Sequence, residues 1–484
     1  MGRAVPEGAV RGRVRIASRK SIVPRGGARQ VFRLRMQQVQ VGLIGGGTVG
    51  GGVWNALSRN GSLMASRLGL GLEVAGIAVR NPGKTRDVSF PSRLVTGDWR
   101  SVVTRPEVQV VVELMGGTTT ARDVVIAALR LGKPVVTANK ALLSAHGEQL
   151  FKEASRHGTN LYYEASVAGG IPIIKVLRES LVGNRVTRLA GIVNGTCNYI
   201  LTRMQLEGAA FADVLADAQR LGYAEAEPSL DVDGHDAAHK TGILASLAHG
   251  FWVKPSQVHT EGIRHITQLD IQFAARLGYT IKLLGIVKCL GDGELPRTSA
   301  NKKGRRGTCS IQVSVYPALV PRTHVLASVN HAFNAVAVRG DVVGDTLFYG
   351  RGAGSDATAS SVLSDLADAA LDLKNGSHRR VPPFVAHEGN GRVVPLAEVV
   401  SRYYVRLSVV DRPGVFSRIA GILARAGIGI SSIIQPEGHA GETVPVILMI
   451  HDAPNAAMQR VLKQIASLSV IRAAPVMIRV EDLE

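Results

Sequence analysis

The sequence predicts an α/β protein of three domains, and three stretches of hydrophobic patterning lead to this fold class. Residues 38–165 alternate short apolar runs with amphipathic helical segments, which is typical of a parallel sheet covered by helices. Residues 166–348 mix strand and helix periodicity, which favours an α+β domain. Residues 401–484 follow the order βαββαβ of a ferredoxin-like unit. The length of 484 residues also exceeds the size at which one hydrophobic core usually stops growing.

The composition is that of a globular protein. Hydrophobic residues make up 45% of the chain and charged residues 20%. Each apolar run is broken well short of the roughly 20 residues that a membrane-spanning helix requires. Cys197, Cys289 and Cys309 are odd in number and lack CxxC spacing, which argues against a disulfide framework and against a cysteine-based zinc site. We therefore predict a cytoplasmic protein without a membrane partner.

The net charge of +19 is unevenly distributed along the chain. Ten arginines and lysines precede Met36, against Glu7 alone, and a second basic cluster, NKKGRR, lies at residues 301–306. Neither cluster has aromatic side chains interleaved for base stacking, since Phe32 is the single aromatic residue in the two, so we predict solvated segments and no nucleic-acid partner. Residues 1–37 are predicted to be a basic, disordered extension. A start assigned too far upstream of Met36, or an organellar import signal, is the alternative interpretation.

The first domain opens with a strand, a glycine loop and a helix, in VQVGLIGGGTVGGGVWNAL. LEVAGIAVR, VQVVVELMGG and KPVVTANKALL supply further strands, separated by helical stretches such as ARDVVIAALRLG. Gly45, Gly47 and Gly50 form GxGxxG between the first strand and the first helix. These glycines permit a tight turn and a close backbone approach to a pyrophosphate at the positive end of the helix. We predict a Rossmann-type domain that binds a dinucleotide.

The end of the second strand indicates which dinucleotide is bound. NAD-selective domains usually place an acidic residue there, where it holds the ribose 2′-hydroxyl. This chain has Arg80 instead, and an arginine suits a 2′-phosphate. We therefore favour NADP over NAD, although the neighbouring Asn81 could hydrogen-bond a ribose hydroxyl.

The second domain combines helices such as FADVLADAQRLG and DAAHKTGILASLAHG with strands such as TRLAGIVNG and SIQVSVYP. Residues 349–373 begin with glycines and continue as a long amphipathic helix, which we predict to return to the first domain and complete it. Residues 374–400 are polar and contain proline and glycine, so we predict a linker.

Eight segments together give the chain a family resemblance. They are GLIGGGTVGGGV, VVELMGG, VVTANKALL, YYEASVAGGIPII, GIVNGTCNYILTRM, GYAEAEPSLDVDGHDAAHK, GRGAGSDATASSV and YYVRLSVVDRPGVFSRIAGIL. In this order they resemble homoserine dehydrogenase with a C-terminal ACT domain, from about Gln38 to the C-terminus. The resemblance implies NAD(P)-dependent interconversion of L-homoserine and L-aspartate 4-semialdehyde, in the biosynthesis of threonine and methionine. It also makes residues 166–348 the catalytic and dimerisation domain and implies a homodimer or homotetramer.

The resemblance also implies roles for individual residues. Lys240 is similar to the family's acid/base residue, and Asp236 to its neighbour at the reacting oxygen. Glu225 matches the carboxylate that holds the substrate ammonium, Asp231 matches a further substrate-side acid, and Lys140 matches a lysine beside nicotinamide and substrate. The cofactor contacts implied in this way are Gly45, Gly47, Thr48, Val49, Gly50, Arg80, Gly116, Lys140 and Gly354. A sodium-type site of main-chain carbonyls maps to Glu164, Val167, Gly169 and Ile171.

The motif around Lys240 departs from the family pattern at one position. Glu227 precedes Pro228, where the family has Asp, Asn or Ser. We interpret Glu227 and Asp233 as turn or helix-entry groups, because Asp233 precedes a glycine and a helix.

The same residues allow other readings without the family. Asp236 and Lys240 lie four residues apart, so they share a helix face and could form an ordinary surface ion pair. The sequence HDAAH is similar to the HExxH zinc motif, but its acid is one methylene shorter and no third ligand follows. Cys197 could act as a thiol nucleophile. The non-enzymatic alternative is a Rossmann-type sensor of a dinucleotide and an amino acid, which would need no acid/base lysine.

The C-terminal domain contains SVVDRPGVFSRIAGIL, in which Pro413 and Gly414 turn the chain from a strand into a helix. The first N–H groups of that helix are available to a carboxylate. Because ACT domains usually bind amino acids, we predict threonine as a feedback effector near Asp411, Gly414 and Gln435. A dimerisation module without a ligand is the alternative.

Overall fold

The structure is a computed structural model that describes residues 37–224, 226–290, 309–378, 380–439 and 441–483. Its first sheet has six strands in the order β3-β2-β1-β4-β5-β6, all paired in parallel. The strands are β1 (Gln38–Ile44), β2 (Gly71–Ala78), β3 (Val95–Thr96), β4 (Val110–Glu113), β5 (Val135–Thr137) and β6 (Leu161–Tyr162). This parallel sheet confirms the predicted fold class of the first domain.

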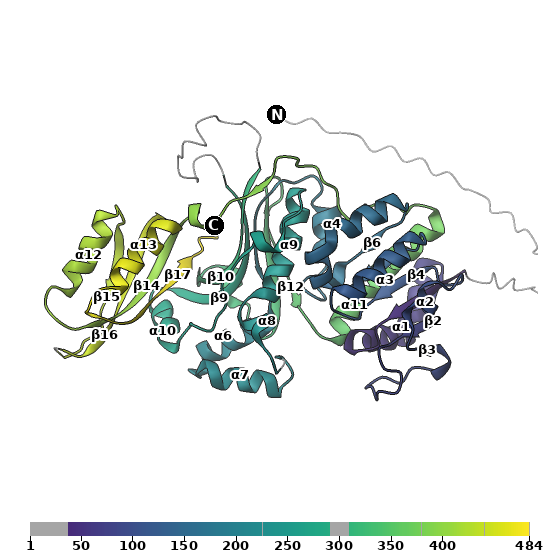
Figure 1. Ribbon diagram of the computed structural model, residues 1–484, viewed down its shortest axis with the longest axis horizontal. Coiled ribbons are helices and arrows are strands. Elements are labelled where there is room, and N and C mark those ends of the chain that lie inside the picture. The colour runs from purple at the N-terminus through teal and green to yellow at the C-terminus, as the bar shows by residue number, and fades with distance from the viewer. Residues whose placement is uncertain (1–36, 225, 291–308, 379, 440, 484) are drawn as a thin grey trace, which may run out of the picture. The chain divides into compact units, whose positions relative to one another are not determined.

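Helices cover both faces of this sheet (Figure 1). They are α1 (Thr48–Leu68), α2 (Trp99–Val103), α3 (Thr119–Arg130), α4 (Lys140–Arg156) and α11 (Ser355–Asn375). The apolar sides of α1 and α11 share one core with Val39, Val41 and Leu43 of β1, whereas α2, α3 and α4 contribute to the other core. Both faces are therefore buried, as expected for strands that read as continuous apolar runs.

The second sheet has eleven strands, and nine of them follow the order β12-β11-β7-β9-β10-β17-β14-β16-β15. Its first part consists of β7 (Val186–Ile192), β9 (Tyr279–Cys289), β10 (Ser310–Pro321), β11 (Phe333–Gly340) and β12 (Gly344–Arg351), with β8 (His259–Thr260) and β13 (Arg392–Val393) paired to β10. The helices with it are α5 (Ile173–Lys175), α6 (Gly195–Glu207), α7 (Phe211–Arg220), α8 (Ser229–Val232), α9 (His235–His249) and α10 (Gln268–Arg276).

The rest of the second sheet belongs to the βαββαβ unit, whose predicted order is confirmed. It contains β14 (Val400–Val410), α12 (Val415–Arg425), β15 (Ile430–Ile434), β16 (Thr443–Pro454), α13 (Asn455–Ala466) and β17 (Ile471–Val480). Its last strand pairs in parallel with β10 through Ala318–Arg479 and Leu319–Val480, so one sheet runs through both parts. Among the helices of the described residues, none has the length and apolar character needed to cross a membrane.

Arg479 stabilises the place where β17 pairs with β10. Its guanidinium is 1% exposed and donates to both carboxylate oxygens of Glu261, at 2.9 and 3.0 Å, and to Asn455 Oδ1 at 2.9 Å. It also lies 4.6 Å from the centre of the Tyr316 ring. Burial raises the pKa of Glu261, but the His259 hydrogen bond and the Arg479 charge outweigh burial and lower that pKa to about 2. The pair is therefore ionised at neutral pH.

We predict that Arg479→Met lowers the free energy of unfolding by about 3–5 kcal/mol, because it leaves a largely buried carboxylate without its main cation. Urea denaturation followed by circular dichroism measures this. Arg402→Met is the matched control, because Arg402 is 3.9 Å from Asp482 in an exposed pair, and its loss should stay within about 0.5 kcal/mol.

The same pair sets a pH dependence of stability. The folded pKa of Glu261 is about 2, below the unfolded value of about 4.3. Its stabilisation is therefore fully present above about pH 4.3 and is lost as the pH falls from there towards 2. Arg479→Met should flatten that part of the stability curve, and an unchanged slope would contradict the assignment.

Candidate active site

The three glycines of the GxGxxG motif have different tasks. A Cβ on Gly50 would lie 2.1 Å from the carbonyl oxygen of Gly45, and one on Gly45, at φ 114°, would lie 2.5 Å from that of Leu114. These two glycines allow the turn to close. Gly47 is exposed, precedes α1 and has open space where a Cβ would stand. The N–H groups at the positive end of α1, which begins at Thr48 and Val49, therefore remain accessible to a phosphate.

Helix α11, which returns to the first domain, places its N-terminus beside the N-terminus of α1. Ser355 Oγ donates to the Thr48 carbonyl at 3.0 Å, and a Cβ on Gly52 would lie 2.4 Å from Ser355 Oγ. Gly354 precedes α11 at φ 116° and, like Gly47, has no atom near its Cβ direction. The structure thus brings together the predicted cofactor residues of the first loop and of the return.

The loops after β4 and β5 are tied to each other. Buried Glu113 accepts from Thr137 Oγ1 at 2.7 Å, and Asn139 Nδ2 donates to the Gly117 carbonyl at 2.7 Å. Asn139 also caps α4 through the Leu142 N–H, so Lys140 begins that helix at a fixed place. Gly116, in the left-handed region at φ 73°, is exposed beside this junction. Arg80 is exposed just beyond β2.

A buried carboxylate between two lysines forms the centre of the site. Asp236 is 3% exposed and lies in the first turn of α9. Its Oδ2 accepts from Lys240 Nζ at 2.7 Å, and its Oδ1 pairs with Lys140 Nζ at 2.9 Å. Lys240 is also buried and donates to the Val193 carbonyl at 2.8 Å. The pair is therefore not the solvent-exposed i,i+4 bridge that the spacing alone also allowed.

The charges around Asp236 decide its protonation state. Burial raises the pKa of Asp236, but the ammonium groups of Lys240 and Lys140 outweigh burial and hold that pKa well below its usual range. The group is a carboxylate at neutral pH. Lys140 comes from the first domain and Lys240 from the second, so their contact with Asp236 also joins the two.

Asn194 orients Asp231 and Asp236, although the sequence alone did not single it out. Its Nδ2 donates to Asp231 Oδ1 at 2.7 Å and to Asp236 Oδ2 at 3.0 Å, while its Oδ1 caps α6 at the Cys197 N–H. Burial raises the pKa of Asp231. An asparagine between a strand and a helix is a typical N-cap, and that signal could have marked Asn194.

The remaining residues of the GYAEAEPSLDVDGHDAAHK motif divide between local structure and solvent. Glu225 lies outside the described residues. Glu227 is exposed and accepts from the Ser229 N–H at 3.0 Å at the start of α8, which agrees with the helix-entry role expected of it. The Asp233 side chain pairs with Arg264 instead of capping α9. His235 is exposed and His239 half-buried, and within the described ranges no group of three histidine, cysteine or acidic side chains could hold a metal ion.

The predicted cation loop follows β6. Glu164, Val167, Gly169 and Ile171 are all buried, and the chain bends sharply at Ala168 and Gly169, whose φ angles are 56° and 53°. The Gly169 carbonyl accepts from Ser361 Oγ at 2.6 Å and the Ile171 carbonyl from the Ile173 N–H at 2.8 Å. Each carbonyl oxygen has a second lone pair. The loop therefore keeps oxygen donors of the kind that a hard cation prefers.

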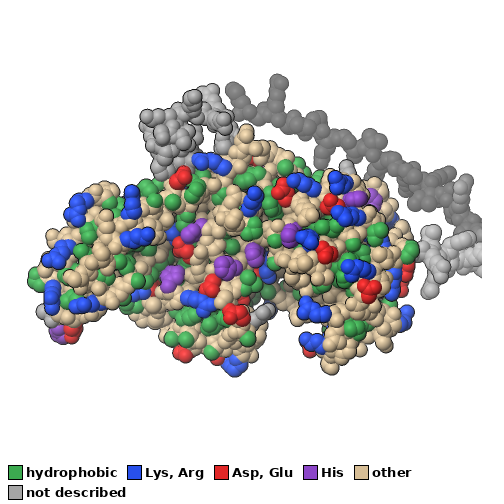
Figure 2. Space-filling model, viewed as in Figure 1, with side chains coloured by type: hydrophobic (Ala, Val, Ile, Leu, Met, Phe, Trp, Pro, Cys, Tyr) green, Lys and Arg blue, Asp and Glu red, His purple; other side chains and the backbone are tan. Residues whose placement is uncertain are grey.

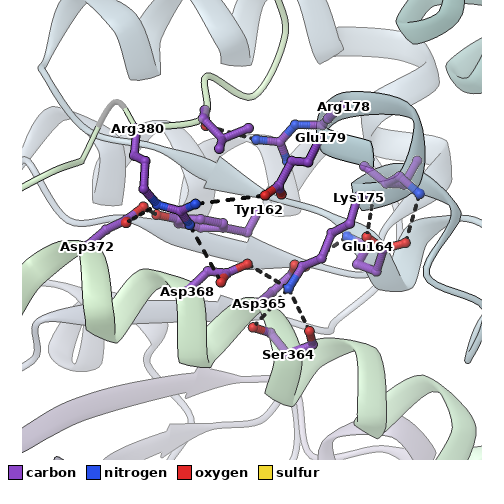
Figure 3. Close-up of polar contacts among 12 residues, drawn as sticks. Tyr162, Glu164, Lys175, Arg178, Glu179, Ser364, Asp365, Asp368, Asp372 and Arg380 are labelled. Carbon is purple, nitrogen blue, oxygen red and sulfur yellow. Dashed lines mark hydrogen bonds and ion pairs between the residues drawn. The ribbon is translucent and has the colours of Figure 1, made fainter. Parts of the chain in front are cut away.

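A charged network anchors this loop to α11 (Figure 3). The Glu164 carboxylate accepts from the N–H groups of Ile174 and Lys175, both at 2.8 Å, and the Glu164 N–H donates to Asp365 at 2.8 Å. Lys175 Nζ pairs with Asp368 at 2.6 Å. Burial is the main cause that raises the pKa of Glu164 to about 7 and that of Asp365 to about 8. The position of the loop therefore depends on α11.

The predicted effector residues lie at one end of the βαββαβ unit. Gly414 precedes α12 at φ 83° with open space around its Cβ direction, and the Val415 N–H at the start of that helix donates to the Arg412 carbonyl at 3.3 Å. Gln435 Nε2 donates to Asp411 Oδ1 at 3.4 Å, which brings the two predicted side chains into contact.

Comparisons with known proteins agree with these features. Family models described as "Homoserine dehydrogenase, NAD binding domain", "Homoserine dehydrogenase" and "ACT domain" match residues 45–164, 172–367 and 403–468. Homoserine dehydrogenase from Pseudomonas aeruginosa is 43% identical over 452 residues, which are 93% of this chain and 100% of that protein.

Solved structures give the same result. A homoserine dehydrogenase structure from Thiobacillus denitrificans has a TM-score of 0.83 and 41% identity, covering 93% of this chain and 99% of that one. A hyperthermophilic archaeal homoserine dehydrogenase, solved in complex with NADPH, has a TM-score of 0.56 and 25% identity, covering 69% and 98%.

We predict that alanine in place of Gly50 lowers the stability of the fold, whereas alanine in place of Gly47 weakens dinucleotide binding. Gly50→Ala should destabilise the fold by about 1–3 kcal/mol, because its methyl group would overlap the Gly45 carbonyl. Gly47→Ala should leave the melting temperature unchanged, because φ is −82° and no atom obstructs the methyl group. Its methyl group should instead meet the dinucleotide and weaken dinucleotide binding about tenfold, or about 1.4 kcal/mol, in a fluorescence titration. Wild-type affinity in Gly47→Ala would contradict this placement.

Proposed function

The chain belongs to the homoserine dehydrogenase family of oxidoreductases, and on this premise we propose that Lys240 is its acid/base residue in the interconversion of L-homoserine and L-aspartate 4-semialdehyde. The observation that carries this proposal is the buried Asp236 carboxylate, held by Lys240 at 2.7 Å and by Lys140 at 2.9 Å. A pathway role in threonine and methionine biosynthesis follows from this reaction.

The bound dinucleotide supplies or accepts the hydride in this reaction. In the direction of reduction, Lys240 donates a proton to the aldehyde oxygen as that oxygen gains negative charge, and in oxidation it takes the hydroxyl proton back. Asp236 holds Lys240 in place, and the Val193 carbonyl fixes the direction of the ammonium group. Asp231 and Glu225 bind the substrate ammonium, and Lys140 lies where its charge attracts the substrate carboxylate.

The rival assignments have less support. A sensor without catalysis has no need of a lysine buried against a carboxylate and a carbonyl. A thiol mechanism would need a reactive Cys197, but burial is the main cause that holds the pKa of Cys197 well above its usual value, and its Sγ donates to the Asp231 carbonyl at 3.2 Å. Activity that survives in Cys197→Ala would exclude that mechanism.

We propose NADP rather than NAD as the preferred cofactor, with Arg80 binding the 2′-phosphate. Its exposed position beyond β2, without an acidic residue at that place, supports this preference. A monovalent cation such as sodium would bind the carbonyls of Glu164, Val167, Gly169 and Ile171, and there it would stabilise the loop beside α11.

The ACT domain implies a small-molecule effector, and we propose threonine. The N–H groups at the start of α12 suit its carboxylate, and Asp411 suits its ammonium group. We also propose a homodimer or homotetramer. The exposed side chains of Leu347 and Tyr349 on β12, at the edge of the second sheet, support association.

We expect Lys240→Ala to lower kcat about 10²- to 10⁴-fold with aspartate semialdehyde and NADPH, because general acid catalysis is lost. Lys152→Ala is the matched control, since Lys152 forms an i,i+4 pair with Glu148 that is largely exposed, and it should keep wild-type kcat. Melting temperatures separate a catalytic loss from unfolding. Wild-type turnover in a folded Lys240→Ala would refute the assigned role.

Arg80→Ala is expected to raise the KM for NADPH about 10- to 100-fold, which corresponds to losing one charge-assisted contact, and to leave the KM for NADH within about twofold. Arg67→Ala, at the opposite end of α1, should change neither value. Steady-state kinetics with both cofactors measures this. An equal loss for NADPH and NADH would contradict 2′-phosphate binding.

Calorimetry with threonine should detect binding to the wild-type chain, and kinetics should show inhibition. Asp411→Ala should weaken this binding at least about tenfold, because the ammonium group loses its carboxylate. Asp452→Ala, which removes an exposed acid at the far end of β16, should retain it. If the full-length wild type neither binds threonine nor is inhibited by it, the effector assignment is wrong.

A further inference from the structure

Two of the three cysteines meet where β9 ends and β10 begins. Cys289 is the register partner of Ile311, and Cys309 stands two residues before Ile311, so both side chains belong to the same face of the sheet. The Leu290 N–H donates to the Ser310 carbonyl at 2.9 Å and extends the ladder between them. Cys289 is also the neighbour that raises the pKa of Cys309 most. The strand register and this interaction place the two thiols close together.

The backbone allows this contact to become a bond. Diagonal partners on one face of a flat antiparallel pair are about 7–8 Å apart at Cα, slightly beyond the roughly 6.8 Å limit for a disulfide. Strand twist shortens one diagonal of such a pair. Cys309 precedes β10, and its carbonyl accepts from the Arg392 N–H of β13 at 2.9 Å, so closing the bond requires a small shift at the end of this ladder.

The surroundings give the two sulfur atoms different roles. Cys289 is exposed, whereas Cys309 is half-buried. The interaction with Cys289, followed by burial, raises the pKa of Cys309, so Cys309 keeps its proton at neutral pH. His249 Nδ1 lies 3.6 Å from Cys309 Sγ, and burial lowers the pKa of His249 to about 4, which leaves an uncharged imidazole beside the thiol.

We propose that Cys289 and Cys309 are a reversible redox pair that peroxide converts into a disulfide across the ends of β9 and β10. The Cys289 sulfur attacks one peroxide oxygen, the O–O bond breaks, and the departing hydroxide takes the proton of the Cys289 thiol and leaves as water, which gives a sulfenic acid. The Cys309 sulfur then attacks the Cys289 sulfur, the S–O bond breaks, and the departing hydroxide takes the Cys309 proton and leaves as a second water. In sum, two thiols and one hydrogen peroxide give one disulfide and two waters.

This site is separate from the reaction centre. His249 is the last residue of α9, and Asp236 lies in its first turn, so the helix places them roughly 20 Å apart at 1.5 Å per residue. The disulfide would close the segment 291–308 at its base, and that segment contains several arginines and lysines at which trypsin cleaves. A reversible pair at the surface is compatible with a reducing compartment, in which a structural disulfide framework is not expected.

The test counts thiols before and after oxidation. The folded full-length protein is treated with a tenfold excess of hydrogen peroxide, catalase removes the excess, and the unfolded chain is titrated with Ellman's reagent. The thiol count should fall from three to one and return to three with dithiothreitol. Tryptic digestion without reductant should give one linked pair of peptides that contains Cys289 and Cys309 and is two hydrogens lighter than the separate peptides.

Variants distinguish the pair from nonspecific oxidation. Cys197→Ser, which removes the buried cysteine, should still form the link, and its thiol count should fall from two to none. Cys309→Ser should stop at a Cys289 sulfenic acid that dimedone labels, and Cys289→Ser should form no link. All three variants should keep kcat within twofold of wild type.

Three results would overturn the proposal. One is a wild-type chain that keeps all three thiols. Another is oxidation of Cys289 to sulfinic acid without a linked peptide. The third is a link that joins two chains, which appears as a doubled mass on a non-reducing gel.

Discussion

A buried carboxylate that needs two cations is the constraint on which the arrangement of the site depends. Asp236 is almost entirely removed from water, and an unpaired charge in that position would cost several kcal/mol. Lys240 supplies one partner from the same helix, but Lys140 comes from the first domain. The helix of the second domain and the loop after β5 must therefore lie together before either is stable. The outline of the molecule is notched between the regions of α7 and α1 (Figure 2).

A second buried charge connects the βαββαβ unit to the catalytic part. Arg479 binds Glu261, and the segment after Glu261 contacts the residues that precede α9. The Ile263 N–H donates to the Val232 carbonyl at 2.8 Å. A Cβ on Gly262 would lie 2.2 Å from the same oxygen, so only glycine fits there. A displacement of the C-terminal part of the second sheet would therefore strain the segment that contacts α8 and the start of α9. A regulatory domain joined to the rest of the chain only by a flexible linker would lack this contact through Arg479 and Glu261.

Local features were predictable from the sequence, and contacts between distant segments were not. The glycine loop and the Asp236–Lys240 pair are set by a turn and by helix spacing, so their local geometry follows from the sequence. The acid/base role of Lys240 was implied by the family resemblance, because the spacing alone also allows a surface ion pair. Lys140 was placed at the site by family resemblance alone, because its contact with Asp236 spans two domains. Nothing in the composition marks the pairing of β10 with β17 or the partner of Arg479. The sequence did not indicate the proximity of the Cys289 and Cys309 thiols, because it depends on the register between β9 and β10. Glu227 departs from the family motif yet keeps a local hydrogen bond to Ser229.

The path of the chain has a consequence for protein synthesis. One face of the first sheet is sealed by α11, whose buried residues Val362 and Leu366 share a core with β1. The ribosome finishes β6 about two hundred residues before it finishes that helix. At about 5–20 residues per second, the part of this face that α11 covers stays exposed for about 10–40 s. During that interval the nascent chain exposes an apolar surface of the kind that chaperones bind. The order of segments along the chain therefore creates a need for chaperones during synthesis that the folded structure does not reveal.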